Sequence, residues 1–444
     1  MAGGTWTSQN KVLPGVYIRF TTGSALGLTV GERGIVTICE PMSWGPVGQV
    51  TSVTLTTDLT PITGYDITAP QNRFLQEMFK GTNRTSAPTT ILLYRPSATS
   101  SAQAAVTTGE LTATAVYPGA RGNDITIVIT ELTEPASTFT VSTVVDGAIV
   151  DQQTAAQISE LTANAWVTFS GTGALAATTG APLVGGADGT VESAAYSAYL
   201  TAIEPYKFDI MVYDGSDSTV QTALLAFIER VNENNGQYCQ LVASGLTNPD
   251  SRYVINVNSP VTLDDGTQLT AQQVTWWVGG AQAGAMYNQS LTYATYPGAV
   301  STTMNTNDQF ISDIQAGYLD LFAEDGTVKV MQDINSLITY TEDIGQVYSK
   351  NRVMRLCNTI ANDIFQQFSA NFIGVVNNNE AGRARFQAAI VGYLQQIQDN
   401  QGIQNFTAED VEVLAGTAID AIVVNVAIQA VDSVEKVYLS LEIS

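Results

Sequence analysis

Histidine is absent from this chain of 444 residues, and positively charged residues are scarce. Without histidine, no Ser-His-Asp triad, Cys-His pair or histidine-ligated metal site can form. Lysine and arginine number 18 against 41 aspartate and glutamate residues, so the formal net charge is −23. Proteins that bind nucleic acid need clustered cations to neutralise the phosphates. The composition therefore excludes histidine-dependent catalysis and argues against a nucleic-acid partner.

Cysteine is also scarce, and long apolar runs are lacking. Cys39, Cys239 and Cys357 are far apart and form no CxxC spacing, so neither a disulfide framework nor a zinc cluster is indicated. We expect three free thiols in a reducing compartment. The first ten residues contain no basic segment followed by an apolar run, and a membrane span of about 18 apolar residues occurs nowhere. The sequence thus predicts neither export by a signal peptide nor insertion into a membrane.

The residues that are present predict several folded domains. Hydrophobic residues make up 45% of the chain and charged residues 13%, which excludes a disordered chain and a charged coiled coil. At roughly 150 residues per domain, the length predicts about three domains. Residues 97–182 are dominated by Ala, Thr, Ser, Val and Gly, and alternating stretches at 124–130 and 139–145 end in turn residues. This pattern predicts a small inserted β-sandwich.

From residue 183 the hydrophobic period changes from two to about 3.6. Helix-like stretches alternate with strand-like ones, in the order 191–203, 208–212, 219–232 and 239–243. Such alternation is typical of an open, parallel α/β sheet. Beyond residue 334 we expect a long helical tract and a second helix over 381–397. The first of these helices carries Leu356, Cys357, Ile360, Ile364 and Phe368 on one face, and Arg352, Arg355, Thr359, Asn362 and Gln366 on the other.

Strand-like runs lie near both ends of the chain. Apolar residues alternate with other residues in three runs: Val16, Ile18 and Phe20 around Tyr17; Ile422, Val424, Val426 and Ile428; and Val437, Leu439, Leu441 and Ile443 around Tyr438. Natural proteins normally shield terminal strands of this kind, because an exposed strand edge pairs with other chains. Two interpretations stay open. The runs either add strands to sheets in neighbouring copies or pair within one chain.

Five segments with these and neighbouring residues resemble one known family. They are GGTWTSQNKVLPGVYI at 3–18, YPGARGN at 117–123, LVGGADG at 183–189, IVVNVAIQ at 422–429 and DSVEKVY at 432–438. In their order and spacing they are similar to the tail sheath proteins of contractile phage tails and phage-like bacteriocins, in the branch found in Gram-positive prophages. The resemblance runs across essentially the whole chain.

The resemblance implies a multidomain α/β and α+β protein. Its expected parts are an N-terminal arm at 1–24, the N-terminal part of the core at 25–96, the β-sandwich at 97–182, a subtilisin-like open α/β domain at 183–333, a C-terminal α+β domain at 334–431 that the N-terminal segment completes, and a C-terminal arm at 432–444. "Subtilisin-like" describes topology only. The connectors at 21–24 and 432–433 are expected to act as hinges.

The implied function is structural. Such subunits form stacked hexameric rings around a tail tube and contract to drive the tube through the envelope of a target cell. The arms are exchanged between neighbours, with Val16, Tyr17, Ile18, Phe20, Val437, Tyr438, Leu439, Leu441 and Ile443 as linking residues and Ile422, Val424, Val426 and Ile428 as the acceptor strand. The implied partners are other copies, the tube protein, and baseplate and terminator proteins. Assembly is expected in the bacterial cytoplasm, and the product is part of the released tail or bacteriocin.

No motif in the sequence favours chemistry over structure. A subtilisin triad and a GxSxG elbow are both missing, and so is a Walker A motif. The stretch at 171–176 matches GxGxxA, but the residues after it do not favour the helix that a dinucleotide site needs. The acidic doublets at 264–266 and 324–326 fit turns and not a calcium loop. We expect no catalytic residue, no cofactor, no metal and no ATP hydrolysis.

Five of the cations lie close together, at Lys350, Arg352, Arg355, Arg383 and Arg385. One interpretation is a solvated helix face that pairs with Asp343 or Asp363. The other, which the family resemblance favours, is that Arg352 and Arg355 face an acidic tail tube through weak, breakable ion pairs. Two other functional classes remain as alternatives: a non-contractile self-assembling shell or surface polymer, and an α/β hydrolase.

Overall fold

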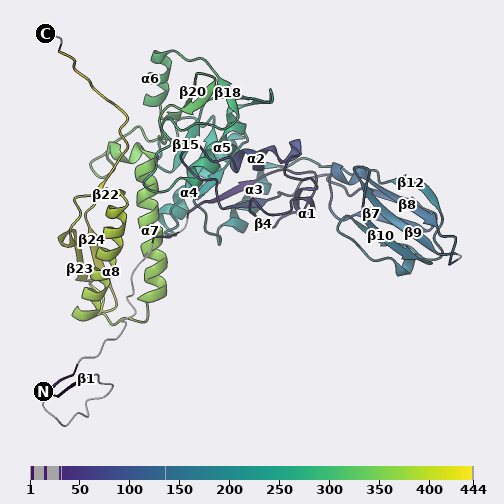
Figure 1. Ribbon diagram of the computed structural model, residues 1–444, viewed down its shortest axis with the longest axis horizontal. Coiled ribbons are helices and arrows are strands. Elements are labelled where there is room, and N and C mark those ends of the chain that lie inside the picture. The colour runs from purple at the N-terminus through teal and green to yellow at the C-terminus, as the bar shows by residue number, and fades with distance from the viewer. Residues whose placement is uncertain (1, 5–14, 18–29, 32, 136, 443–444) are drawn as a thin grey trace. The chain divides into compact units, whose positions relative to one another are not determined.

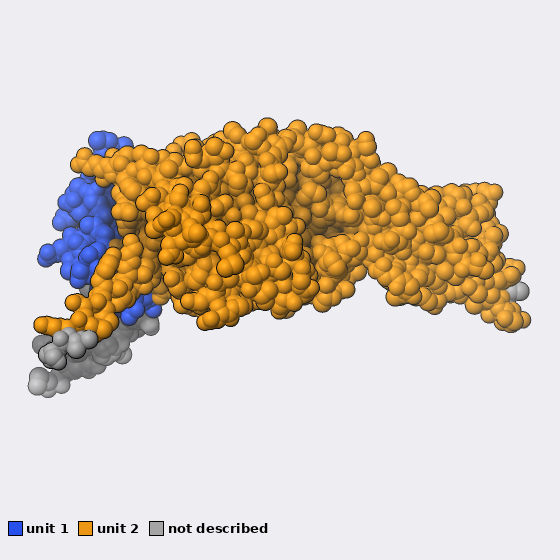
Figure 2. Space-filling view, turned by 90° about the horizontal axis from the view of Figure 1, so that it is seen from above, with its two compact units in different colours: residues 1–30, 363–429 blue, residues 31–362, 430–444 orange. Residues whose placement is uncertain are grey.

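A computed structural model describes residues 2–4, 15–17, 30–31, 33–135 and 137–442 of the chain (Figure 1). The chain divides into two compact units, one of residues 1–30 and 363–429 and the other of residues 31–362 and 430–444 (Figure 2). The boundary between residues 362 and 363 falls within the long helix α7 (Asn351–Asn371). We refer to residues 31–362 with 430–444 as the large unit and to the rest as the small unit.

A seven-stranded sheet organises the large unit. Its spatial order is β19 (Tyr318–Leu319), β15 (Val254–Val257), β14 (Gln240–Ser244), β13 (Ile210–Val212), β3 (Ile35–Cys39), β5 (Thr90–Tyr94) and β4 (Val50–Val53). All neighbouring strands are parallel except the edge pair β4–β5. The predicted open, parallel α/β sheet is therefore confirmed.

Each face of this sheet is covered by helices. Along β3, Val36 and Ile38 enter the core beneath α2 (Arg73–Met78) and α5 (Ala271–Gly284), whereas Cys39 enters the core beneath α3 (Ser193–Ile203) and α4 (Ser218–Glu233). Helix α4 starts where Asp217 accepts hydrogen bonds from the backbone N–H groups of Thr219 and Val220, an N-cap that a buried apolar stripe then follows. Burial on both faces explains why these strands read as continuous apolar runs.

The large unit also contains smaller elements around the sheet. These are α1 (Thr60–Thr63), the 3-10 turns η1 (Pro70–Asn72) and η4 (Gln346–Ser349), the three-stranded sheet of β17 (Gln268–Leu269), β16 (Val261–Leu263) and β18 (Ala299–Thr302), the helix α6 (Asn307–Gln315), and the hairpin of β20 (Leu321–Glu324) and β21 (Thr327–Val330). The acidic doublets at 264–266 and 324–326 lie in turns of these two small sheets, as predicted.

The inserted β-sandwich is confirmed between β5 and α3. One sheet has the order β10 (Ala148–Ala155), β9 (Phe139–Val145), β8 (Ile125–Glu131) and β12 (Thr178–Pro182); the other has β11 (Val167–Ser170), β7 (Leu111–Ala115) and β6 (Ala105–Thr108). The turns η2 (Ala120–Asp124) and η3 (Ile158–Glu160) complete it. A loop and the strand β12, rather than a helix, follow β11, so the segment 171–176 lacks the helix of a dinucleotide site.

The sandwich is tightly joined to the rest of the large unit. Trp44, from the loop after β3, is fully buried in the sandwich core, with its ring 4.9 Å from that of Trp166 and 5.3 Å from that of Tyr117. At Gly119, φ is 136° and a Cβ would lie 2.0 Å from the carbonyl oxygen of Ser43. Only glycine permits this approach, which explains the Pro-Gly step of the motif at 117–123.

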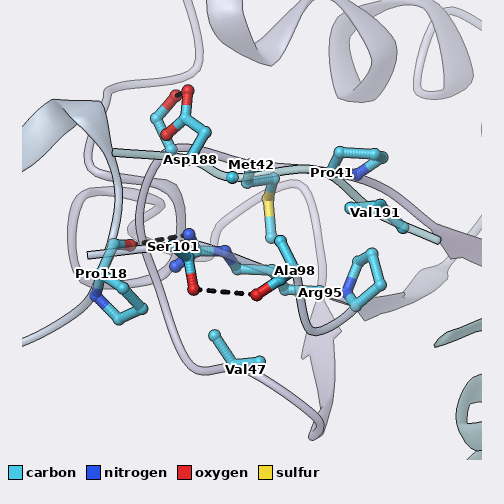
Figure 3. Close-up of a pocket in the computed structure, with 12 residues that line it drawn as sticks. Pro41, Met42, Val47, Arg95, Ala98, Ser101, Pro118, Asp188 and Val191 are labelled. Atoms are coloured by element: carbon cyan, nitrogen blue, oxygen red, sulfur yellow. Dashed lines mark hydrogen bonds between the residues drawn. The ribbon is translucent and has the colours of Figure 1, made fainter. Parts of the chain in front are cut away.

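Two buried arginines add to this joint. Arg95 donates to the carbonyl oxygens of Gly45 and Pro118, at 2.7 Å each. Arg121 pairs with Asp146 at 2.5 Å, and its guanidinium lies 4.1 Å from the ring centre of Tyr65. Figure 3 shows Arg95, Pro118 and Ser101 around a cavity of about 100 Å³, which is smaller than the about 300–1,000 Å³ of ligand pockets. The joint thus serves packing rather than ligand binding.

The small unit contains the end of α7 together with α8 (Glu380–Asp399), where a helix over 381–397 was predicted. Phe368, Phe372 and Phe386 pack with ring centres 4.7–5.8 Å apart. The other elements up to Gln429 are β22 (Ile403–Gln404), η5 (Ala408–Asp410), β23 (Val411–Ala415) and β24 (Ile422–Val426), and β25 (Gln429–Ala430) follows across the unit boundary. Near the N-terminus, β1 (Ala2–Gly4) pairs with β2 (Gly15–Tyr17) in parallel.

The three cysteines carry free thiols, as the sequence predicts. Cys39 and Cys239 are buried, Cys357 is partly buried, and all three are free. Within residues 33–135 and 137–442, no helix combines the length and the apolar character that a membrane span requires.

A buried pair of carboxyl groups in the large unit predicts a pH-dependent stability. Asp313 and Asp320 are both more than nine-tenths buried, and the Oδ2 atom of each receives no hydrogen bond from the described residues. Burial and then the charge of Asp313 raise the pKa of Asp320 to about 7. The folded protein therefore holds a proton that the unfolded chain releases at lower pH, so stability falls as the pH rises through about 7. Burial also raises the pKa values of Glu40 and Asp214, so the Asp320→Asn variant should show a smaller loss of stability between pH 5 and pH 8 than the native chain, as urea unfolding at the two pH values would measure. An unchanged difference between the two pH values would contradict the assignment.

Candidate assembly site

The strand β24 has one open edge in the described part of the chain, where its sheet consists of β23 and β24 alone. The two strands are antiparallel, and Gly416 N–H donates to the oxygen of Ala421, while Ala427 N–H donates to that of Asp410. In this register the backbone groups of odd-numbered residues of β24 bond to β23. The N–H and C=O groups of Ile422, Val424 and Val426 therefore point to the open edge.

Ile422, Val424 and Val426 are three of the four residues that the sequence predicts for the acceptor strand, and all three lie in β24. The fourth, Ile428, lies outside β24, because this strand ends at Val426 and residues 427–428 lie in no strand before β25 begins. The last backbone hydrogen bond of this ladder is donated by the N–H of Ala427 to the oxygen of Asp410, the residue before β23, at 2.9 Å. The predicted strand over 422–428 is therefore wrong at Ile428. The edge that remains offers hydrogen-bonding groups over one five-residue strand.

The C-terminal arm is apolar and exposed. Val437, Tyr438, Leu439 and Leu441 are each 77–90% exposed, and the described residues 431–442 form no strand. The predicted strand over 437–443 is thus not formed within the chain itself, since a strand needs a partner for its backbone groups. Ile443 lies outside the described residues. A run of exposed apolar side chains of this kind indicates a surface that another molecule covers.

The N-terminal arm is described only in part. Val16 and Tyr17 lie in β2, where they pair with Gly3 and Gly4 of β1. This pairing lies within one chain and occupies one edge of a very short strand. Ile18 and Phe20 lie outside the described residues. The linking role of these four residues stays a prediction.

The two arginines predicted to face a tube are not on the surface. Arg355 is 0% exposed and pairs at 2.7 Å with Asp333, which is 1% exposed. Its guanidinium also donates to the side-chain oxygen of Gln282 and, at 2.6 Å, to the backbone oxygen of Gln289. Arg352 is 9% exposed, and burial lowers its pKa. The assignment of Arg355 and Arg352 to a tube contact is therefore wrong.

Arg352 and Arg355 are buried because the first turns of α7 are surrounded by other parts of the large unit. The sequence pattern assumes one buried face and one solvated face, but Thr359, on the face predicted to be polar, is also buried. The helix begins inside the large unit, so polar side chains there need internal partners. Gln282 and Asp333 provide them for Arg355, at separations of 73 and 22 residues along the chain. No local spacing in the sequence could have indicated this network.

Four family profiles match consecutive parts of the chain. The N-terminal region of domain III of the tail sheath protein Gp18 matches residues 33–95, the phage tail sheath β-sandwich domain 97–188, the phage tail sheath central domain 189–336 and the phage tail sheath C-terminal domain 343–444. The chain belongs to the phage tail sheath protein family. The β-sandwich described above thus matches the sheath β-sandwich domain. The seven-stranded sheet combines β3, β4 and β5 from the Gp18 domain III region with β13, β14, β15 and β19 from the central domain.

Similar proteins support this over the full length of the sheath chain. A sheath tail protein of Desulfitobacterium hafniense is 41% identical, with a TM-score of 0.87 over 96% of this chain and 99% of that one. A sheath tail protein of Listeria innocua is 30% identical, with a TM-score of 0.78 over 94% and 96% of the two chains. The phage-like element PBSX protein XkdK of Bacillus subtilis is 32% identical over 100% of both chains.

The role of this sheath protein is therefore structural. It is a component of a phage or phage-like particle, and membership of a sheath family implies a polymer of identical chains. None of the four matching profiles describes an enzyme. In the described residues, the edge of β24 and the C-terminal arm leave backbone groups and apolar side chains uncovered.

Proposed function

We propose that this sheath subunit forms stacked hexameric rings around a tail tube, and that contraction of the sheath drives the tube through the envelope of a target cell. Neighbouring copies are linked by donated strands, with residues 437–443 of one copy and 16–20 of another completing the sheet at β24. The observation that carries this proposal is the open edge of β24, where Ile422, Val424 and Val426 present their backbone groups.

The energetics favour a joint of this kind. A hydrogen bond contributes about 0.5–1.5 kcal/mol net, and three residues with outward backbone groups can form up to about six such bonds with an added strand. Ordering the donated segment costs about 1–2 kcal/mol per residue, so the hydrogen bonds alone are not enough. Burial of Val437, Leu439 and Leu441, at about 25 cal/mol per Å² of apolar surface, supplies the remainder. The joint therefore needs both the backbone hydrogen bonds and the burial of these apolar side chains. A segment must supply both to bind, and this requirement makes the joint specific.

The other parts of the proposal follow from the same assignment. The partners are further copies of the chain, a tube protein, and baseplate and terminator proteins. Assembly takes place in the bacterial cytoplasm, and the sheath leaves as part of a phage tail or bacteriocin. The proposed domain division is 1–24, 25–96, 97–182, 183–333, 334–431 and 432–444, with a subtilisin-like topology in the fourth part and the N-terminal segment completing the fifth. Energy is stored in the extended lattice at assembly, since the sequence offers no ATP site.

A proline at the open edge tests the donated-strand joint. The N–H group of Val424 points away from β23, so Val424→Pro removes no bond within the subunit but removes one donor from the edge and blocks strand addition. We expect a folded subunit that forms no tubes in negative-stain electron microscopy. The control Val424→Thr retains the donor and should form tubes.

The same micrographs test the function itself. A contractile sheath gives striated hollow cylinders, whereas a non-contractile shell or a surface polymer gives closed particles or flat lattices. Flat lattices from the native chain would overturn the proposed contractile function, and long tubes from Val424→Pro would overturn the donated-strand joint.

A further inference from the structure

We propose that Glu435 anchors the C-terminal arm to the large unit and thereby sets the point from which the donated strand leaves its subunit. This inference rests on the proposed strand donation. The Glu435 carboxylate accepts hydrogen bonds from the hydroxyl of Thr292 at 2.8 Å, the amide of Gln332 at 2.6 Å and the ammonium of Lys350 at 2.5 Å. Three donors from three separate segments of the large unit thus converge on one residue of the arm.

The exposure pattern along the arm is the reverse of that of an ordinary surface segment. The side chain of Glu435 is only 12% exposed, whereas Val434 and Val437 on either side are 85% and 81% exposed. Burial alone would raise the pKa of Glu435, but the hydrogen bonds from Lys350, Gln332 and Thr292 lower it below its ordinary value. The carboxylate, and not apolar burial, therefore holds this part of the arm in place.

The contact of Glu435 with Thr292 is connected to a buried ion pair of the large unit. The hydroxyl of Thr292 donates to Glu435 and accepts, at 2.9 Å, the backbone N–H of Asp333. Asp333 is the buried partner of Arg355. Thr292, one of the three donors for Glu435, is consequently positioned by the network that also orders the start of α7. A preorganised set of donors of this kind binds its partner with a smaller entropic cost.

The position of the anchor limits which copy can receive the strand. The proposed donated strand begins at Val437, two residues beyond Glu435, so with the anchor in place its first residue stays within about 7 Å of Glu435. If the anchor were lost, the free segment would start near Ala430, and Val437 could move about 25 Å from that point. The anchor thus confines the start of the donated strand to a small region at the surface of the large unit. The hinge predicted at 432–433 lies before the anchor, so free motion of the arm begins only at Lys436.

Limited proteolysis of the unassembled full chain tests the anchor separately from assembly. Trypsin must take up residues on both sides of the bond that it cuts, so cleavage after Lys436 requires Glu435 to leave its three donors. In the non-assembling Val424→Pro background, the cleavage rate therefore follows the population in which the anchor is open. Lys350→Met and, separately, Gln332→Leu leave the arm's own sequence unchanged and should each raise this rate about tenfold. The control Lys329→Met removes a lysine that pairs with Glu324 at 2.7 Å in a hairpin of the same unit, and should leave the rate unchanged. Equal rates in all four proteins would overturn the anchor.

Electron microscopy of the same substitutions in the native background tests the selection of the neighbour. With a longer free arm, Lys350→Met should give tubes of uneven diameter or with breaks in the lattice, whereas Lys329→Met should give regular tubes. Regular tubes from Lys350→Met would overturn the selecting role. This result is distinct from failure of strand donation, which predicts no tubes from the native chain.

Discussion

A subunit shortened by residues 437–444 will fold but will form no tubes. The described residues that are removed contribute exposed apolar side chains and take part in no strand, so their loss costs the isolated subunit little. In the polymer the same residues would supply the strand at the open edge of β24. Their loss removes every hydrogen bond and all apolar burial at that joint, which makes the expected effect all or none. Sedimentation separates tubes from single subunits, and circular dichroism confirms that the shortened chain is folded.

The alternation in the arm offers a sharper version of this experiment. Side chains of a strand point alternately to its two faces, so Val437, Leu439 and Leu441 share one face and Tyr438 lies on the other. Changing all three aliphatic residues to serine should abolish the tubes, whereas Tyr438→Ser should weaken them only. Long, stable tubes from the triple variant would mean that the arm does not dock as a strand.

Arg355→Met will lower the free energy of unfolding of the large unit by about 3–5 kcal/mol, because removing one partner of a buried ion pair leaves the other charge unpaired. Asp333 would keep its amide and backbone donors but lose the charge that neutralises it. Urea unfolding followed by tryptophan fluorescence measures the loss, since Trp276 and Trp277 lie in the core of the same unit.

A surface ion pair provides the control for this variant. Arg230 bonds both carboxylate oxygens of Glu204 at 2.8 Å, but the two side chains are 42% and 37% exposed. Arg230→Met should therefore cost only about 0–1 kcal/mol. The double variant Asp333→Asn with Arg355→Met should recover part of the stability lost by Arg355→Met. If the Arg355 and Arg230 variants proved equally stable, Arg355 would have to be solvated, as its pattern in the sequence suggested.

The sequence predicts the secondary structure of the large unit well, because the apolar periodicity there is set by the burial of its strands and helices. Strands buried on both faces must be continuously apolar, and the helices that cover them must repeat every 3.6 residues. The strand expected at 239–243 is observed at Gln240–Ser244, and the helix expected at 219–232 at Ser218–Glu233. The β-sandwich follows from strict alternation in the same way.

The strands predicted near the C-terminal end of the chain are formed only in part, because a strand requires a partner strand. The alternation at 437–443 is a property of the sequence, but in the described residues no strand forms, because no second strand lies beside it. Residues 422–428 obey the same pattern, yet the strand stops at Val426, where the backbone bonds to the β23 side end. Alternation of apolar residues indicates which side chains lie on the same face of a strand. It does not indicate which other strand the segment pairs with.

The sequence by itself determined the β-sandwich, the parallel sheet and the lack of histidine-dependent chemistry, since composition and local periodicity are sufficient for each. The family followed from the resemblance of five segments to known sheath proteins. Only the tertiary structure shows that the charged side chains of Arg355 and Glu435 are held by internal partners. Both charges lie in helical or linker segments that read as solvated, and both are held by donors and acceptors from distant parts of the chain. Whether a charge is solvated or buried depends on the segments that pack around it, and these are brought together by the fold rather than by neighbouring residues in the sequence.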